Sequence, residues 1–116
     1  MNFKNKTLSI FGNGKQIGDY IYIDDLVNAF LLCSSPKANG QIYNLCFGKG
    51  ISFVDMAFLI KSVAGKGQIR HVKWPDEAKE VETGDYVSNV NKIKIDLNFT
   101  PKIGFKEGVV KTIKSQ

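Results

Sequence analysis

Three glycines near the start of the chain, Gly12, Gly14 and Gly18, have a spacing that could hold a phosphate. They follow the short apolar run 8–11, and a strand that ends in a glycine-rich turn is typical of dinucleotide-binding folds. Such a turn holds the anion by opening into a helix, whose N-terminal amides and dipole face the phosphate. The next residues, 19–23, read DYIYI, which indicates a second strand. We therefore interpret the glycines as turn residues that join two strands. A nucleotide-binding domain centred on Gly12–Gly14 is excluded if 19–23 is a strand.

Three carboxylates, Asp19, Asp24 and Asp25, flank the same turn. One interpretation is that Asp24 or Asp25 caps a helix that begins there, with the remaining charges solvated. The alternative is that one of the carboxylates positions a ligand or a neighbouring loop. The sequence leaves both interpretations open.

No other combination of residues predicts catalysis. His71 is the single histidine and lies in a predicted strand, which is typical of a surface residue. Cys33 and Cys46 have neither C-x-x-C nor zinc spacing, so we expect small, buried, reduced side chains. The glycines of 48–50 do not match a P-loop, and G-x-S-x-G is absent. We predict no catalytic residue and no metal site.

Charge and length exclude several classes of protein. The 116 residues predict one domain, 1–116, and their net charge of +5 comes almost entirely from dispersed lysines, with Arg70 as the only arginine. This pattern argues against nucleic-acid binding but suits a small anionic ligand. The sequence has neither a run of about 20 apolar residues nor an apolar signal segment. We expect a cytoplasmic protein that does not interact with membranes.

The hydrophobic pattern predicts a mixed α/β fold with short connections. Residues 75–83 are expected to form an irregular link, and Asn98 to end the third helix in a left-handed conformation. The predicted strands are 8–11, 16–23, 41–47 and 68–74, and the four predicted helices are 25–32, 52–65, 89–97 (or from 91) and 105–113.

Three stretches carry a resemblance to a known family. GNGKQIGDYIYIDDLVNAF is similar to G-x-G-x-Q-x-R-D-[YF]-[IV]-[YH]-V-x-D-[LV]-x-x-A, and IYNLCFGKGISFVDMAFLI to I-Y-N-[LI]-G-x-G-x-x-x-S-[VL]-x-[ED]-[LM]-A. ETGDYVSNVNKIKIDLNFTPKIGFKEGVVKTI is similar to a closing segment with G-D, K-[IA] and E-G-[LI]-x-x-T-[IV]. These are patterns of the extended short-chain dehydrogenases/reductases, the NAD-dependent nucleotide-sugar epimerases and dehydratases. The resemblance covers nearly the whole chain in the family's order.

The resemblance implies the C-terminal, substrate-binding part of such an enzyme, with isomerase or lyase chemistry in the intact protein. The family's N-terminal Rossmann part, with its glycine fingerprint and Tyr-x-x-x-Lys pair, has no counterpart here. NAD is therefore expected as the cofactor of the intact enzyme, and no cofactor is expected for this chain alone. The implied ligand is a nucleotide-sugar, and the isolated chain is expected to be inactive.

Carried over residue by residue, the resemblance implies a partial substrate site. Phe11 matches the position beside the nucleobase, and Asn44 matches an asparagine near the cleft. Gly18 stands where the family has an arginine that reaches the diphosphate, and Glu82 and Thr83 stand near the place of a second arginine. The predicted substrate-binding residues are Phe11, Gly12, Lys15, Gly18, Tyr20 and Asn44, with Lys15 as the nearest basic substitute.

The resemblance also implies that helix 25–32 and strand 42–45 pack against the Rossmann part. In this chain their apolar surfaces need another cover, which self-association as a homodimer or a rearranged packing would supply. The second hypothesis is accordingly a degenerate or truncated non-catalytic module that self-associates or binds a partner chain.

Overall fold

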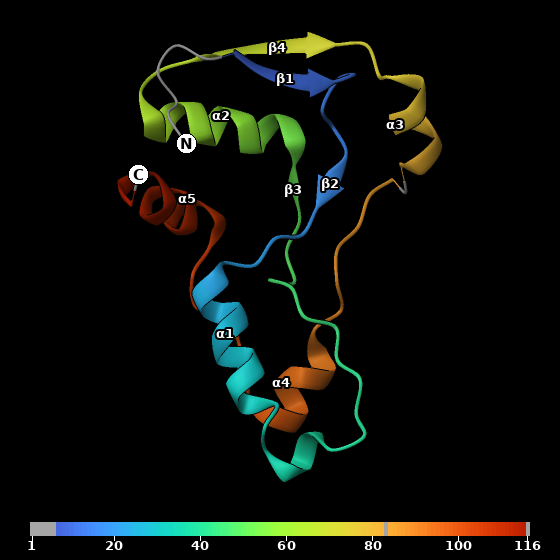
Figure 1. Cartoon of the computed structure of the whole chain (residues 1–116), viewed down its shortest axis with the longest axis vertical. Coiled ribbons are helices and arrows are strands. Elements are labelled where there is room, and N and C mark those ends of the chain that lie inside the picture. The colour runs from blue at the N-terminus through green and yellow to red at the C-terminus, as the bar shows by residue number, and fades with distance from the viewer. Residues whose placement is uncertain (1–6, 83, 116) are drawn as a thin grey trace.

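The structure, a computed structural model, describes residues 7–82 and 84–115, so Thr83 of the predicted link lies outside the described residues. The predicted mixed α/β fold is confirmed. Figure 1 shows two groups of elements joined by extended segments: β1, β4, α2, α3 and α5 in one, and α1, η1 and α4 in the other. The elements are β1 Thr7–Phe11, β2 Ile17–Gly18, α1 Ile23–Leu32, η1 Pro36–Ala38, β3 Ile51–Ser52, α2 Phe53–Ala64, β4 Gln68–Val72, α3 Asp76–Val81, α4 Asn91–Leu97 and α5 Phe105–Lys114.

The upper group is built on a parallel pair of strands. β1 pairs with β4 in the register Thr7↔Gln68 to Phe11↔Val72, and α2 packs against both strands (Figure 1). Side chains alternate along β1, so that Leu8 and Ile10 lie on its less exposed face.

The predicted return strand over 16–23 is wrong in extent and in pairing. β2 consists of Ile17 and Gly18 alone and pairs antiparallel with β3, while α1 already begins at Ile23. The glycine turn therefore joins strands of two different sheets and forms no hairpin. After Gly18 the chain leaves the sheet, and the carboxylate of Asp19 accepts hydrogen bonds from backbone amides of distant segments.

Helices α2 and α4 end at the capping and left-handed residues that the sequence predicts. Ser52 caps α2 by accepting a hydrogen bond from the Asp55 amide at 3.1 Å, and Gly65 ends the helix at φ 72°. Asn98 takes the predicted left-handed conformation after α4. The irregular link predicted over 75–83 is wrong in part, because Asp76–Val81 forms α3, a helix with acidic residues in its first turn.

The lower group has a small core between α1 and α4. Ala29, Ile93 and Phe99 are buried there, and the half-buried Tyr43 and Leu45 pack against them. The Tyr43 hydroxyl donates to Asp96 Oδ2 at 3.1 Å, which fixes the extended segment to α4.

The strand predicted over 41–47 is wrong, since this segment is extended but pairs with no strand among the described residues. Its alternation is that of a strand: Tyr43 and Leu45 face the core, while Ile42 is 84% exposed. A continuous apolar run indicates a strand only when a neighbouring strand completes the hydrogen-bond ladder.

Helix α1 has two apolar faces. The first, with Ala29, packs into the lower core. The second is an exposed row at helical spacing that we call the α1 stripe and that covers about 100° of the circumference. The α1 stripe consists of Ile23, Val27, Phe30 and Leu31, which are 57, 47, 61 and 66% exposed.

The chain is less compact than a domain of its length. Its radius of gyration is 16.6 Å, and its extents are 48 × 35 × 18 Å. A compact domain of this size has a radius of about 13 Å. Within the described residues, no helix is long and apolar enough to cross a membrane.

Candidate functional site

Two aromatic side chains meet where the parallel strands end. Phe11 closes β1, Trp74 follows β4, and their ring centroids lie 5.3 Å apart at an interplanar angle of 51°. Between them, Gly12 has a φ of 64°, and an added Cβ would lie 2.6 Å from Trp74 Nε1. Glycine at this position therefore lets the indole approach the backbone, which no other residue would allow.

This aromatic pair forms one side of a cavity of about 410 Å³ between β1 and α2, which we call the aromatic cavity. A volume of this size is in the range of small-molecule sites, and aromatic walls favour a flat ring. Its lining residues are Leu8, Ser9, Ile10, Phe11, Tyr20, Phe53, Met56, Ala57, Ile60 and Trp74.

Tyr20 also lines the aromatic cavity. Its ring lies 6.0 Å from the ring of Phe105, the first residue of α5, so Tyr20 lies between α2 and α5. Burial, and secondarily the charge of Glu82, raises the pKa of the Tyr20 hydroxyl above its usual value of 10.0. The hydroxyl is therefore protonated at neutral pH and can donate a hydrogen bond.

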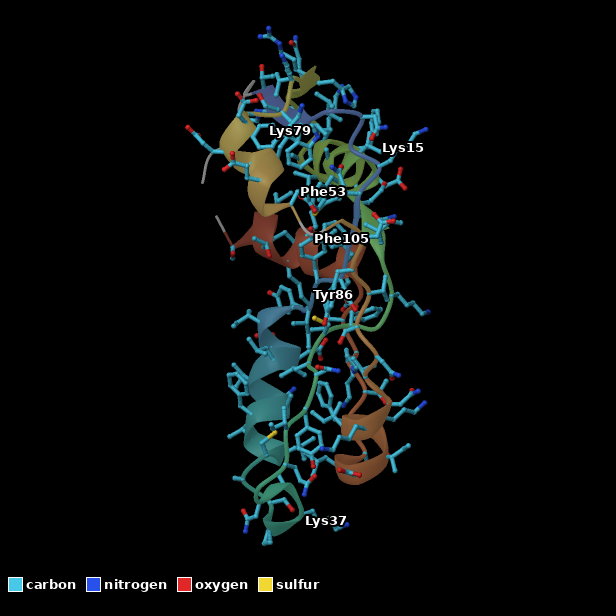
Figure 2. All side chains as sticks on the ribbon, turned by 90° about the vertical axis from the view of Figure 1, so that its right-hand side faces the viewer. Lys15, Lys37, Phe53, Lys79, Tyr86 and Phe105 are labelled. Carbon is cyan, nitrogen blue, oxygen red and sulfur yellow. The ribbon has the colours of Figure 1, made fainter. Side chains whose placement is uncertain are left out.

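The structure brings together only part of the predicted set. Phe11 and Tyr20 line the aromatic cavity. Gly12 and Gly18 do not line it, but they lie against two side chains that do, Trp74 and Tyr20 respectively. Lys15 is exposed and at the outer edge of the molecule in Figure 2, and it lines none of the described cavities.

Asn44 lies away from this group, on the extended segment of the lower half. Its side chain donates from Nδ2 to the Asn89 carbonyl at 3.4 Å, which ties the segment to the start of α4. In the described residues it lines none of the cavities.

His71 has a structural contact in this region. It is exposed on β4, and its Nδ1 lies 2.8 Å from the Gly12 carbonyl oxygen, at hydrogen-bond distance. This contact holds the turn after β1 against β4 and gives the histidine a role that requires no catalysis.

The first carboxylate of the predicted group holds three segments together. Asp19 Oδ1 accepts from the Phe47 amide at 2.9 Å, and Oδ2 accepts from the amides of Gly48 at 2.9 Å and Ser88 at 3.0 Å. Charge-assisted bonds of this kind are roughly twice as strong as neutral ones. Of the two interpretations, positioning of neighbouring loops is the one that the contacts of Asp19 support.

The Asp19 contacts give a prediction for hydrogen exchange. In Asp19→Asn, one acceptor becomes an NH₂ group that faces backbone donors, so we expect the amides of Phe47, Gly48 and Ser88 to exchange about tenfold faster or more. Asp76→Asn, at the exposed start of α3, is the control and should leave these three amides unchanged. Equal exchange in both variants would contradict the role of Asp19.

The expected helix cap at Asp24 or Asp25 is wrong. Helix α1 begins at Ile23 after Tyr22, which provides no side-chain cap. Asp25 is instead buried, at 2% exposure, and its carboxylate accepts from the amides of Lys102 at 3.1 Å and Ile103 at 2.9 Å. It thereby joins α1 to the segment that leads into α5.

The glycine turn lacks the geometry of a dinucleotide site. After Gly18 the chain is non-helical until Ile23, so the glycine turn does not open into a helix. The N-terminus of α2 lies beside the turn, but its first amides, those of Phe53 and Val54, donate to the carbonyls of Gln16 and Gly14 and are not free to hold a phosphate. The residues of this chain do not fit the phosphates of a dinucleotide cofactor at this turn.

Trp74 belongs to the candidate site but is not among the residues that the sequence predicts for it. It is the single tryptophan of the chain and comes directly after β4. No sequence signal points to Trp74, because its place beside Phe11 follows from the parallel pairing of β1 with β4, which puts the carboxyl ends of both strands at the same edge.

The sequence of the chain is similar to those of known proteins. Residues 1–46 match the profile of the NAD dependent epimerase/dehydratase family. The human dTDP-D-glucose 4,6-dehydratase is 31% identical over 115 residues, which cover 95% of this chain and 32% of that protein.

Two solved structures superimpose closely on the chain. Pal from Bacillus thuringiensis has a TM-score of 0.82 and 37% identity over 96% of this chain and 36% of its own. The UDP-glucose 4-epimerase of Thermotoga maritima, solved with UDP-glucose, has a TM-score of 0.83 and 26% identity over 93% of this chain and 34% of its own. The chain thus spans about a third of the length of the relatives it matches.

Proposed function

We propose that this chain is the C-terminal, substrate-binding portion of an NAD-dependent nucleotide-sugar epimerase or dehydratase. The observation that carries the proposal is the aromatic cavity between Phe11, Trp74 and Tyr20, in a fold that superimposes on a UDP-glucose 4-epimerase solved with its nucleotide-sugar. The nucleobase would lie between the aromatic side chains, where stacking contributes binding energy.

No catalytic step is assigned to the chain itself. In the intact enzyme NAD would supply hydride transfer at the sugar, but the glycine turn of this chain does not fit a dinucleotide. The described residues would bind and orient the nucleotide part of the substrate, and the predicted contribution of this chain is recognition alone.

A binding measurement tests the proposal with an internal probe. The indole N–H of Trp74 gives a single resonance in a ¹⁵N-labelled chain, because the sequence has one tryptophan. We expect UDP-glucose or dTDP-glucose to shift it and NAD to leave it unchanged. Phe11→Ala should weaken nucleotide-sugar binding about tenfold through loss of one stacking partner.

Phe58→Ala is the matched control, because Phe58 is exposed on α2 and lines none of the described cavities. The proposal requires that this variant bind as the unmodified chain does. Tight binding of NAD, or no shift with either nucleotide-sugar at millimolar concentration, would contradict it.

The second candidate function is that of a non-catalytic module that associates with another chain. The observations that favour it are the α1 stripe and the unpaired extended segment 41–47. Either a second copy of this chain or a chain that contains the remaining two thirds of the relatives' length would cover these surfaces. Sedimentation of the purified chain distinguishes the two partners, because only association with a second copy would give a dimer in the absence of another protein.

A further inference from the structure

A second cavity lies between two helices of the upper group. Figure 1 shows α5 alongside α2, and the cavity between them has a volume of about 280 Å³. Met56 and Ile60 line it from α2, and Val109 and Ile113 line it from α5. The two residues of each pair are one helical turn apart, so their side chains lie on the same face of the helix. We call this space the α2–α5 cavity.

The lining of the α2–α5 cavity is neutral. Among the described residues that line it, none carries a charge, and the polar side chains are those of Tyr20, Tyr22 and Thr112. The Thr112 hydroxyl already donates to the Gly108 carbonyl at 2.8 Å. A charged ligand would therefore lose its hydration in this cavity without gaining an ion pair.

An apolar space of this volume is costly to leave empty. Protein interiors are packed as densely as organic crystals, and a cavity forfeits stability in proportion to its volume. Water does not fill such a space well, because a buried water molecule needs about two to four polar partners. A cavity of about 150 Å³ lined by apolar side chains holds benzene. The α2–α5 cavity, at about 280 Å³, suits a molecule nearly twice that size.

Aromatic side chains give this cavity a preference for flat ligands. A Cβ on Gly108 would lie 2.8 Å from Tyr22 Cδ1, so glycine at this position lets the Tyr22 ring pack against α5. Phe105, one turn earlier in the same helix, also lines the cavity. Aromatic rings attract one another in offset-stacked and edge-to-face arrangements. The lining therefore favours an aromatic hydrocarbon over an aliphatic one.

We propose that the α2–α5 cavity is a second ligand site, which binds a small neutral molecule of the size and polarity of a bicyclic aromatic hydrocarbon. This inference goes beyond the proposed function, because it concerns another cavity and another class of ligand. The two cavities are neighbours, with Tyr20, Met56 and Ile60 in both linings. Isoleucines distinguish them: Ile103 and Ile113 line only the α2–α5 cavity, and Ile10 lines only the aromatic cavity.

Naphthalene and 2-naphthoate, which share a ring system and differ by a carboxylate, test the proposal. The readout is the set of isoleucine δ1-methyl resonances in a ¹³C-labelled chain. We expect naphthalene to shift those of Ile103 and Ile113, to leave that of Ile10 unchanged and to raise the melting temperature. 2-Naphthoate should bind at least tenfold more weakly, because its carboxylate would lose its hydration beside apolar side chains. Equal affinities for the two ligands would overturn the inference.

Three variants locate the ligand in the cavity. Val109→Phe should weaken naphthalene binding at least tenfold, because the larger side chain occupies the space. Lys111→Phe is the matched control, since it adds the same ring to α5 at an exposed position that does not line the cavity, and it should bind normally. Thr112→Val keeps the shape of the lining and removes its hydroxyl, so it should bind naphthalene at least as tightly as the unmodified chain. Weaker binding by Thr112→Val would contradict the proposed ligand class, whether or not Val109→Phe folds.

The remaining outcomes separate other occupants from the proposed one. If naphthalene shifts the resonances of Ile10 and the Trp74 indole in place of Ile103 and Ile113, it occupies the aromatic cavity and the inference is overturned. If the Ile103 and Ile113 resonances shift with protein concentration in the absence of ligand, a second copy of the chain fills the cavity, which also overturns it. The same conclusion follows if naphthalene shifts no resonance. The proposed function is tested separately, by the response of Trp74 to UDP-glucose.

Discussion

Asp25→Ala is expected to lower the free energy of unfolding by about 3 kcal/mol. The carboxylate is 2% exposed and accepts from the amides of Lys102 and Ile103. Its removal breaks charge-assisted hydrogen bonds and leaves two backbone donors without an acceptor, the most costly form of hydrogen-bond loss. Urea unfolding followed by circular dichroism measures the change.

The adjacent carboxylate is the control for this variant. Asp24 has the same charge one residue earlier in α1 but is exposed, so Asp24→Ala should cost only about 0.5 kcal/mol through the helix dipole. Asp25→Asn keeps one oxygen acceptor, so its loss in free energy of unfolding should lie between those of Asp24→Ala and Asp25→Ala. A difference below about 1 kcal/mol between Asp24→Ala and Asp25→Ala would contradict the assigned role of Asp25.

Phe30→Asp is expected to weaken self-association of the chain at least tenfold. Phe30 is 61% exposed at the centre of the α1 stripe, and a second copy that covers the stripe would bury its ring. Loss of the ring removes about 2 kcal/mol of apolar burial, and the new carboxylate adds a desolvation cost. Sedimentation velocity over a concentration series gives the dissociation constants.

Asn28→Asp controls for the added charge, because Asn28 is exposed on the same helix but lies outside the α1 stripe. It should sediment as the unmodified chain does. An unmodified chain that stays at 12.9 kDa at several hundred micromolar would show that a second copy does not cover the stripe. Co-expression with a chain that contains the remaining part of a relative then tests the other partner.

Local features of the fold could be predicted from the sequence because their causes are local. Ser52 and Gly65 mark the ends of α2, and Asn98 ends α4, since capping and left-handed residues act within one turn. The short strand β1 and the mixed α/β class could also be predicted, because hydrophobic periodicity is a property of neighbouring residues.

The pairing of the strands could not be predicted, because it joins residues far apart in the chain. Leu8 lies opposite Ile69, and no turn residue specifies such a parallel pair. For the same reason the run 41–47 was predicted as a strand: its apolar pattern is correct, but a strand also requires a neighbour.

The structure brings together some of the predicted residues and not others. The predicted residues Phe11 and Tyr20 line the aromatic cavity, whereas the position of Trp74 beside them depends on the β1–β4 pairing, which no local pattern specifies. The carboxylates were recognised as a group, but their partners lie at positions such as Ser88 and Lys102, about 70 residues or more along the chain. No local rule connects a side chain to an amide at that separation.

The extended segment 41–47 has a consequence for how long the chain persists in a cell. An extended segment that lies in no sheet, beside an exposed apolar helix, is both a template for intermolecular strand pairing and a substrate for chaperones and proteases. Occupation of this surface by a partner competes with capture by the quality-control machinery. We therefore expect the turnover of the chain to slow as the concentration of a partner that covers the segment rises.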